Sequence, residues 1–257
     1  KALVVYYGLK NNGAKEISQR LNNEKFKLPV GISIAKTNDD KTVATEDGIA
    51  DYFLAYQTFV KAGIGDYYTI NISCPNAFGG EPFVEPDKLN QLLLTLSTLR
   101  GPSSYFPKPV FLKLSPDLSP EQIDQIIELA RKYKISGFIC TNLSKDRSLP
   151  SFQNKIKETL PTDKGGLSGK IVEELANEQI KYVYQKTKGE FVIIGCGGVF
   201  TAKDAYVKIK AGASLIQLIT GLIFEGPQVI SEINQGLVKL LKRDRYKNIG
   251  EAVGAGN

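Results

Sequence analysis

Histidine, methionine and tryptophan are all absent from the 257 residues of the chain. Without histidine, the chain cannot form a Ser-His-Asp triad, a Cys-His pair or a His-ligated metal site. We therefore expect no metal, and acid–base chemistry must come from cysteine, lysine, tyrosine, serine or a carboxylate. The three cysteines, Cys74, Cys140 and Cys196, lie far apart without CxxC spacing, which argues against a disulfide framework and favours a reducing compartment.

Long hydrophobic runs and blocks of one charge are also lacking. No stretch reaches the roughly 18 apolar residues of a membrane-spanning helix. The net charge is +6, but the basic residues are interspersed with acidic ones, unlike the basic arm of a nucleic-acid-binding protein. Because no linker-like segment divides the chain, we expect one domain over residues 1–257, with no nucleic-acid partner.

Hydrophobic periodicity predicts six units in which a short β-branched strand is followed by a helix. The predicted strands are 28–34, 67–73, 109–114, 137–142, 191–195 and 214–220. The predicted helices are 45–63, 87–99, one opened by Ser119-Pro120, 170–186, 202–211 and 227–242. The stretch 1–21 has an amphipathic, helical pattern. Such alternation is typical of parallel α/β proteins.

A doubly wound sheet and a TIM barrel both fit this alternation. The barrel is favoured because unusual residues stand where the strands end, and in a barrel these ends converge on one pocket. The predicted class is therefore a (β/α)₈ TIM barrel of which six βα units are visible. Two further strands are expected upstream of Lys1, which makes 28–34 and 214–220 the edge strands.

Glycine-rich loops after the last two strands predict a phosphate site. Gly195-Cys196-Gly197-Gly198 follows one strand and Leu218-Ile219-Thr220-Gly221 follows the other. Glycines there let backbone N–H groups approach an anion, and the last two βα loops hold phosphate in many barrels. The alternative is that they are only turn glycines. Gly165–Gly169 is expected to open a helix and could bring Ser168 to the same ligand, or could be a flexible loop.

Lysine and asparagine side chains at strand ends predict contacts to a planar ligand. Lys113 lies on an otherwise buried strand, which favours a cofactor contact over a solvent-facing lysine. Asn71, Asn76 and Asn142 can donate and accept at once, as a pyrimidine or a flavin requires. The alternatives are a turn residue for Asn76 and a helix cap for Asn142.

Cys74 is the predicted proton acceptor. It follows a strand, next to Pro75, and with no histidine available a thiolate is the most credible base. Cys140, inside a strand, fits a small buried hydrophobic residue better. Cys196 is expected only to pack against the ligand.

Several long motifs resemble dihydroorotate dehydrogenase. They are NISCPN at 71–76, VFLKLSPD around Lys113, Thr141-Asn142, GGLSG at 165–169, GCGGVFTAKDAYVKIKAGAS at 195–214 and QLITGLIFEGP at 217–227. The run YKNIGEAVGA at 246–255 is similar to the quinone-reducing class 2 branch. The resemblance implies an FMN-containing barrel that oxidises dihydroorotate to orotate, passes electrons to a quinone, and associates with the cytoplasmic side of a membrane through residues before Lys1.

The resemblance also implies roles for individual residues. Those implied to contact FMN are Asn71, Lys113, Thr141, Ser168, Gly169, Gly197, Gly198 and Thr220, with Gly221 added from the phosphate loop. Those implied to hold the substrate ring are Asn71, Asn76 and Asn142. Cys74 would be the catalytic base.

Four positions depart from the class 2 pattern. Cys74 stands where class 2 enzymes usually have serine, and its loop looks like that of class 1. Val5 and Leu9 replace a substrate-binding asparagine and a phenylalanine, and Ser33 replaces an asparagine near the flavin. Two alternatives therefore stay open: another FMN barrel reductase, similar to dihydrouridine synthase, and a non-catalytic ligand-binding barrel.

Overall fold

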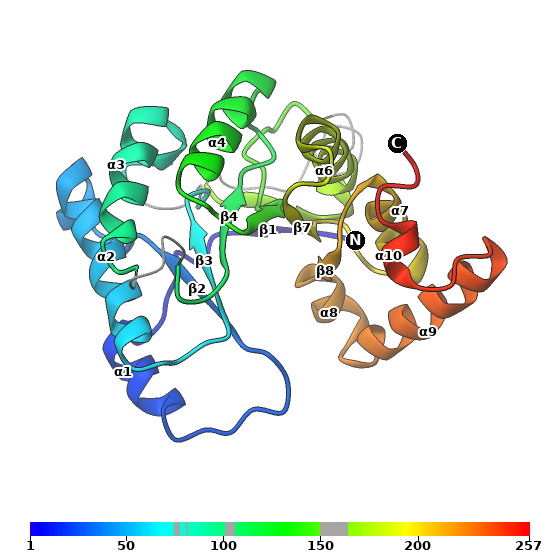
Figure 1. Ribbon diagram of the computed structural model, residues 1–257, viewed down its shortest axis with the longest axis horizontal. Coiled ribbons are helices and arrows are strands. Elements are labelled where there is room, and N and C mark those ends of the chain that lie inside the picture. The colour runs from blue at the N-terminus through cyan, green and yellow to red at the C-terminus, as the bar shows by residue number, and fades with distance from the viewer. Residues whose placement is uncertain (75–77, 81, 101–105, 150–163) are drawn as a thin grey trace. The chain divides into compact units, whose positions relative to one another are not determined.

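The computed structural model describes residues 1–74, 78–80, 82–100, 106–149 and 164–257 (Figure 1). The chain forms two compact units. The N-terminal unit comprises Tyr7–Lys113 and Ser119–Gly137, and the C-terminal unit comprises Lys1–Tyr6, Leu114–Leu118 and Phe138–Asn257. The single domain over residues 1–257 stays a prediction.

The N-terminal unit contains parallel strands covered by helices. In chain order its elements are α1 (Gly13–Leu21), β2 (Gly31–Ala35), a 3₁₀ turn (Asp40–Thr42), α2 (Thr45–Lys61), β3 (Tyr67–Asn71), a 3₁₀ turn (Pro82–Val84), α3 (Pro86–Ser97), β4 (Val110–Leu114) and α4 (Pro120–Lys132). The strands follow the order β2-β3-β4. Ile34 pairs with Ile70, and Asn71 pairs with Lys113.

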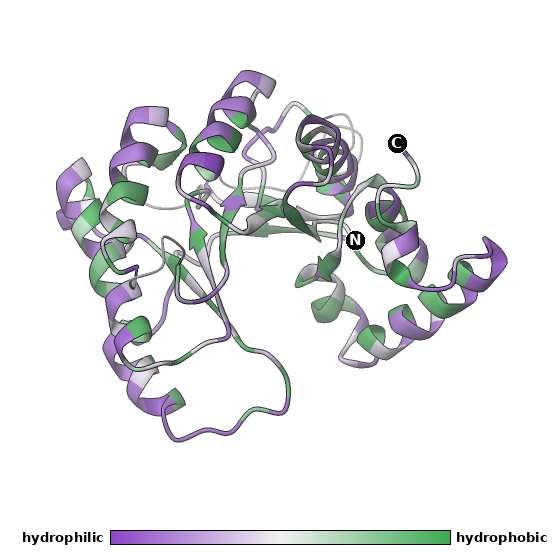
Figure 2. Ribbon diagram, in the orientation of Figure 1, coloured by the Kyte–Doolittle hydropathy of each residue, from purple (hydrophilic) through white to green (hydrophobic). Residues whose placement is uncertain are grey.

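The two faces of these strands differ, because side chains alternate along a strand. Ile70 and Leu112 point to one face and are fully buried, as are Leu89, Leu92, Leu93 and Leu96 of α3. On this face the ring of Tyr56 in α2 meets Tyr68 edge to face, with ring centroids 5.0 Å apart. Figure 2 shows helices that alternate between hydrophilic and hydrophobic residues, as amphipathic helices do. The opposite face of the strands carries Lys113, together with other polar residues.

Helix α4 begins at the residue pair that the sequence indicated. Ser119 Oγ accepts a hydrogen bond from Gln122 N at 3.3 Å, and Gln122 Oε1 accepts one from Ser119 N at 2.9 Å. This capping box satisfies two backbone donors that a helix start otherwise leaves unpaired. Pro120 stands at the first helical position, where its missing N–H costs nothing.

We expect Ser119→Ala to lower the free energy of unfolding by about 1 kcal/mol, the usual value of an N-cap hydroxyl. Urea denaturation would measure this loss. Gln125→Ala, at an exposed position of the same helix, is the matched control and should change stability by less than about 0.5 kcal/mol. Equal effects from the two substitutions would contradict the role of the cap.

The C-terminal unit combines parallel strands with one antiparallel pair. Its elements are β1 (Ala2–Val5), β5 (Gly137–Cys140), β6 (Gly166–Gly169), a 3₁₀ turn (Lys170–Val172), α6 (Glu173–Thr187), β7 (Val192–Cys196), α7 (Ala202–Ala211), β8 (Leu215–Gln217), α8 (Thr220–Glu225), α9 (Gln228–Arg243) and α10 (Ile249–Ala252). The parallel strands follow the order β5-β7-β8. Helices α7 and α9 pack through Ala205, Val229 and Ile233.

Strands β1 and β6 correct two predictions from the sequence. Residues 1–21 are helical only from Gly13, because Ala2–Val5 pairs antiparallel with Gly166–Gly169. Gly165–Gly169 therefore forms a strand and does not open a helix. The physical reason is packing, since Leu167 is buried against Ala2 and Val4 of β1. A strand of four residues is too short for its own pattern to reveal it.

The six predicted parallel strands are all present, and the two predicted edge strands are confirmed. β2 is the first strand in the order β2-β3-β4, and β8 is the last strand in the order β5-β7-β8. In the described part of the chain, no helix has the length and apolar character needed to cross a membrane.

Candidate functional site

Asn71 and Lys113 lie side by side on the face of the N-terminal unit that points away from the buried layer. They are register partners at the ends of β3 and β4. Paired residues of neighbouring parallel strands point to the same face. The structure therefore brings together these two predicted ligand contacts, one amide and one cation. Lys113 is half-buried, and Asn71 is buried.

Hydrogen bonds hold the backbone and side chain of Asn71. The Tyr52 hydroxyl donates to the Asn71 carbonyl at 2.8 Å. Burial raises the pKa of Tyr52, which keeps this hydroxyl protonated as a donor. The Oδ1 atom of Asn71 accepts hydrogen bonds from Ser73 N at 3.3 Å and Ser73 Oγ at 3.1 Å. Asn71 is thus fixed in orientation with its Oδ1 partly occupied.

Cys74 lies three residues after the end of β3 and is half-buried. The side chain of Cys74 interacts electrostatically with the ammonium of Lys36. The predicted base therefore stands near a buried lysine. Asn76, predicted to bind substrate, lies outside the described residues.

Lys36 is a buried cation that the sequence analysis missed. Only 4% of it is exposed, and its Nζ donates to Thr42 Oγ1 at 3.0 Å and to the carbonyl of Phe78 at 2.8 Å. Burial lowers the pKa of Lys36, while the charges of Asp51, Asp39 and Cys74 oppose this shift. Lys36 comes directly after β2, so the rule that singled out strand-end residues could have identified it.

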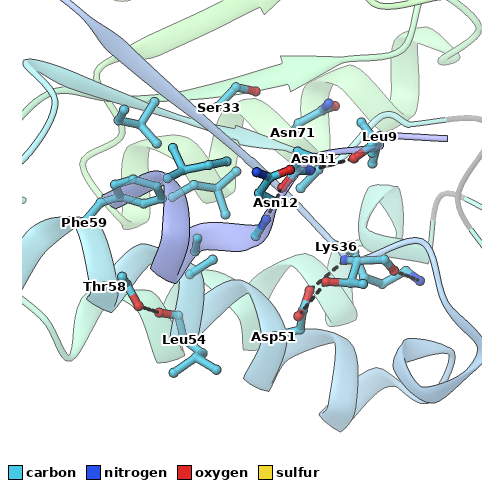
Figure 3. Close-up of a pocket in the computed structure, with 18 of the residues that line it drawn as sticks. Leu9, Asn11, Asn12, Ser33, Lys36, Asp51, Leu54, Thr58, Phe59 and Asn71 are labelled. Carbon is cyan, nitrogen blue, oxygen red and sulfur yellow. Dashed lines mark hydrogen bonds between the residues drawn. The ribbon is translucent and has the colours of Figure 1, made fainter. Parts of the chain in front are cut away.

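An open cavity of about 910 Å³ lies next to β2 in the N-terminal unit (Figure 3). Asn71 and Ser33 face it from the strands, whereas Leu54 and Thr58 face it from α2, and Asn11 lies between the two sides. A mixture of apolar walls and a few polar groups is typical of small-molecule sites of this size. Of the predicted site residues that the structure describes, Asn71 alone lines it.

The C-terminal unit brings together a second group of predicted residues, around two hydroxyls. Ser168 Oγ of β6 and Thr220 Oγ1 of α8 are 2.6 Å apart, within hydrogen-bonding distance. Gly169 lies against Thr220, since a Cβ atom added at Gly169 would be 3.0 Å from Thr220 Cγ2. The positive φ of Gly169, 92°, suits glycine alone here. These contacts join the GGLSG motif to the last βα loop.

The glycine loop after β7 packs against the same region. A Cβ atom at Gly221 would lie 2.1 Å from the carbonyl oxygen of Val199, so only glycine allows the two loops to approach. Gly197 and Gly198 have φ values of 117° and 73°. A Cβ atom at Gly197 would be 3.5 Å from Thr141 Oγ1. Turn geometry and close packing therefore both require these glycines.

Thr141 and Asn142 are placed by backbone hydrogen bonds at the end of β5. The amide of Thr141 donates to the Cys196 carbonyl at 2.7 Å, and the amide of Asn142 donates to the Leu114 carbonyl at 2.8 Å. Cys140, just before them, is fully buried, and burial raises the pKa of its thiol. This environment matches the packing role expected of Cys140.

An ionic cluster stands behind the glycine loop. Lys170 Nζ lies 2.6 Å from Asp204 Oδ1 and 2.8 Å from Glu173 Oε1. Burial alone would lower the pKa of Lys170, but hydrogen bonds to Asp204 and Glu173 raise it. Burial would raise the pKa of Asp204, but hydrogen bonds from Lys170 and from the Phe200 amide lower it. Both groups are therefore ionised at neutral pH.

The predicted site residues thus form two sets, one in each unit. The N-terminal unit holds Asn71, Cys74 and Lys113. The C-terminal unit holds Thr141, Asn142, Ser168, Gly169, Gly197, Gly198, Thr220 and Gly221. Their roles toward a ligand stay predictions.

Comparison with known proteins gives consistent matches. A family model described as dihydroorotate dehydrogenase matches residues 2–241. A relative from Myxococcus xanthus named dihydroorotate dehydrogenase (quinone) is 38% identical over 256 residues, with 99% of this chain and 67% of the relative covered. One from Crocosphaera subtropica with the same name is 36% identical over 260 residues, covering 99% and 66%. The chain spans about two thirds of the length of these relatives.

Solved structures support the fold class. The crystal structure of DHODH in complex with ferulenol from Eimeria tenella has a TM-score of 0.81 and 26% identity, covering 98% of this chain and 71% of that chain. The ligand-free type DHODH from Eimeria tenella has a TM-score of 0.82 and 25% identity, covering 99% and 74%. The predicted α/β fold of the TIM-barrel type is therefore confirmed.

Proposed function

Because the chain belongs to the dihydroorotate dehydrogenase family, we propose that the protein oxidises dihydroorotate to orotate in pyrimidine biosynthesis, with FMN as its flavin and a quinone as electron acceptor. The observation that carries this proposal within the structure is the pair formed by Asn71 and Lys113 on one strand face. An amide and a cation held side by side suit the edge of a flavin or of a pyrimidine ring.

Within the C-terminal unit, the donor set fits the phosphate of a flavin nucleotide. The hydroxyls of Ser168 and Thr220 stand 2.6 Å apart, beside the Gly197-Gly198 turn. Hydroxyl groups and glycine-turn amides are the usual phosphate ligands outside metal sites. In this proposal Gly169, Thr141 and Gly221 complete the contacts to FMN.

The protein's share of the reaction is proton removal and positioning. Bound FMN supplies the acceptor for the hydride that leaves C6 of dihydroorotate. Cys74 takes the proton from C5, so that a C–H bond is lost at each carbon and a C=C bond forms between them. Lys113 stabilises negative charge near N1 and the C2 carbonyl of the flavin. Asn71, Asn76 and Asn142 orient the substrate ring.

The quinone acceptor is supported by the names of the relatives, which are dihydroorotate dehydrogenase (quinone). Because class 2 enzymes usually have serine at the position of Cys74, the electron acceptor needs a test of its own. Steady-state assays of the full-length protein with a soluble quinone, fumarate and NAD⁺ as acceptors would do so. We expect turnover with the quinone only.

Anaerobic titration of the purified full-length protein with dihydroorotate tests the proposed oxidation. We expect a bound flavin whose visible absorbance is bleached by dihydroorotate in stoichiometric amounts. Flavin that dihydroorotate does not bleach would favour another FMN reductase, such as a dihydrouridine synthase-like enzyme. A protein purified without flavin, and unable to bind it, would favour a non-catalytic ligand-binding barrel.

A further inference from the structure

Lys208 is a completely buried lysine in the middle of α7, with an exposed fraction of 0%. Its Nζ donates a hydrogen bond of 2.7 Å to Asn177 Oδ1 on α6. Among the described residues, this is the one hydrogen bond of its ammonium, and the partner is a neutral amide. Lysine is almost never fully buried unless a charge or several acceptors compensate it.

The carboxylates nearest to Lys208 are already occupied by another cation. Glu173 and Asp204 both form ion pairs with Lys170 at 2.8 and 2.6 Å. Burial therefore lowers the pKa of Lys208 to about 8, although the charges of Glu173, Cys196 and Asp204 oppose the shift. The cluster holds two cations and two carboxylates, and Lys208 is the cation without a direct ion pair among the described residues.

The ammonium of Lys208 is buried between α7 and α6, near the point where the glycine loop leaves β7. Helical side chains lean toward the N-terminus of their helix, which for α7 is the end that this loop enters. Cys196, the last residue of β7, interacts electrostatically with Lys208, and the Gly197-Gly198 turn follows it directly. Gly198 rests on the start of α6, since a Cβ atom there would lie 2.4 Å from the Cβ of Glu173. Asp204 accepts hydrogen bonds from the amides of Phe200 and Thr201, at 2.9 Å each.

We propose that Lys208 is a positioning residue for phosphate: its buried charge supports the Gly197-Gly198 turn from behind and favours a phosphate group on the turn's accessible side. The inference rests on the proposed function, because it takes the phosphate to be that of FMN. Lys208 does not touch the ligand, since its side chain has no exposed surface. It acts through the turn and through its electrostatic field, which is weakly screened in the interior.

A purely structural role for Lys208 makes a different prediction. Replacing a buried charge by an apolar side chain of similar length is often neutral or stabilising when packing is kept. Lys208→Met should therefore leave the melting temperature unchanged or raise it. If Lys208 serves the phosphate, the same variant binds FMN less well while keeping its affinity for riboflavin, which has the same ring system without phosphate.

The test measures FMN and riboflavin dissociation constants of the full-length protein after flavin removal, by quenching of flavin fluorescence. We expect Lys208→Met to weaken FMN binding about ten-fold or more, because the charge that it removes acts on the phosphate through a weakly screened interior, and riboflavin binding by less than two-fold. Lys203→Met removes an exposed lysine from the same helix. It controls for the net charge and should change both constants by less than two-fold.

A second variant keeps the proposal testable if Lys208→Met does not fold. Asn177→Asp retains the lysine and gives it a carboxylate partner, which should also weaken FMN binding selectively. Equal loss of FMN and riboflavin affinity, or no loss of either, would overturn the positioning role while the proposed function stands. A parent protein that binds neither flavin would overturn the proposed function, and this inference with it.

Discussion

Replacing Cys74 by alanine is expected to slow the reduction of bound flavin by dihydroorotate about 10²- to 10⁴-fold, the usual contribution of a general base. The flavin should stay bound, since the thiol is assigned to the proton and not to the cofactor. Anaerobic stopped-flow absorbance would measure the rate. Cys74→Ser should keep part of the activity, because class 2 enzymes usually have serine at this position.

The matched control is Cys196→Ala, because Cys196 is also half-buried and stands at the end of a strand, β7. We expect its flavin to be reduced within a few-fold of the parent rate. Reduction of Cys74→Ala at nearly the parent rate would remove Cys74 from the mechanism. In that case the electrostatic contact between Cys74 and Lys36 would belong to the loop's structure alone.

Lys113→Ala is expected to have the second large effect, on cofactor binding and on reduction together. Lys113 is next to Asn71 on the strand face away from the buried core, and a charge-assisted hydrogen bond to the flavin contributes about 1.5–3 kcal/mol. Flavin content after dialysis and the rate of anaerobic reduction should therefore both fall, each by about ten-fold or more.

Lys132→Ala provides the comparison for Lys113. Lys132 ends α4 and donates a hydrogen bond of 2.8 Å to Asn90 Oδ1 in an exposed environment. Its removal changes the net charge equally and should leave flavin content and reduction rate unaltered. If Lys113→Ala resembles Lys132→Ala in both measurements, then Lys113 does not contact the flavin, and the cation beside N1 must be sought elsewhere.

The sequence predicted the parallel strands and their helices well because each carries a local pattern. Helix α7 was predicted with the same bounds that the structure has, Ala202–Ala211, since Thr201 caps its start and Gly212 follows its end. Strand-end residues such as Asn71 and Lys113 could be singled out because burial of the preceding residues makes a polar side chain conspicuous. Helix caps and polar strand ends can both be identified from a few neighbouring residues of the sequence.

What the sequence could not predict depends on contacts between distant segments. Nothing in Ala2–Val5 identifies its antiparallel partner Gly166–Gly169, because pairing is decided by packing on Leu167. Lys208 was missed for a related reason. Lysine is normally a surface residue, so only the structure reveals that neighbouring elements enclose the side chain of Lys208.

The pairing of β1 with β6 has a consequence for the order in which the protein folds. Its two strands are separated by about 160 residues, so closing this pair costs more loop entropy than joining neighbouring βα units. During synthesis Ala2–Val5 leaves the ribosome before Gly166–Gly169, and these residues must wait until their partner strand has emerged. We expect the amides of β1 to gain protection from hydrogen exchange last during refolding, and Ser168 to reach its place beside Thr220 only in that final step.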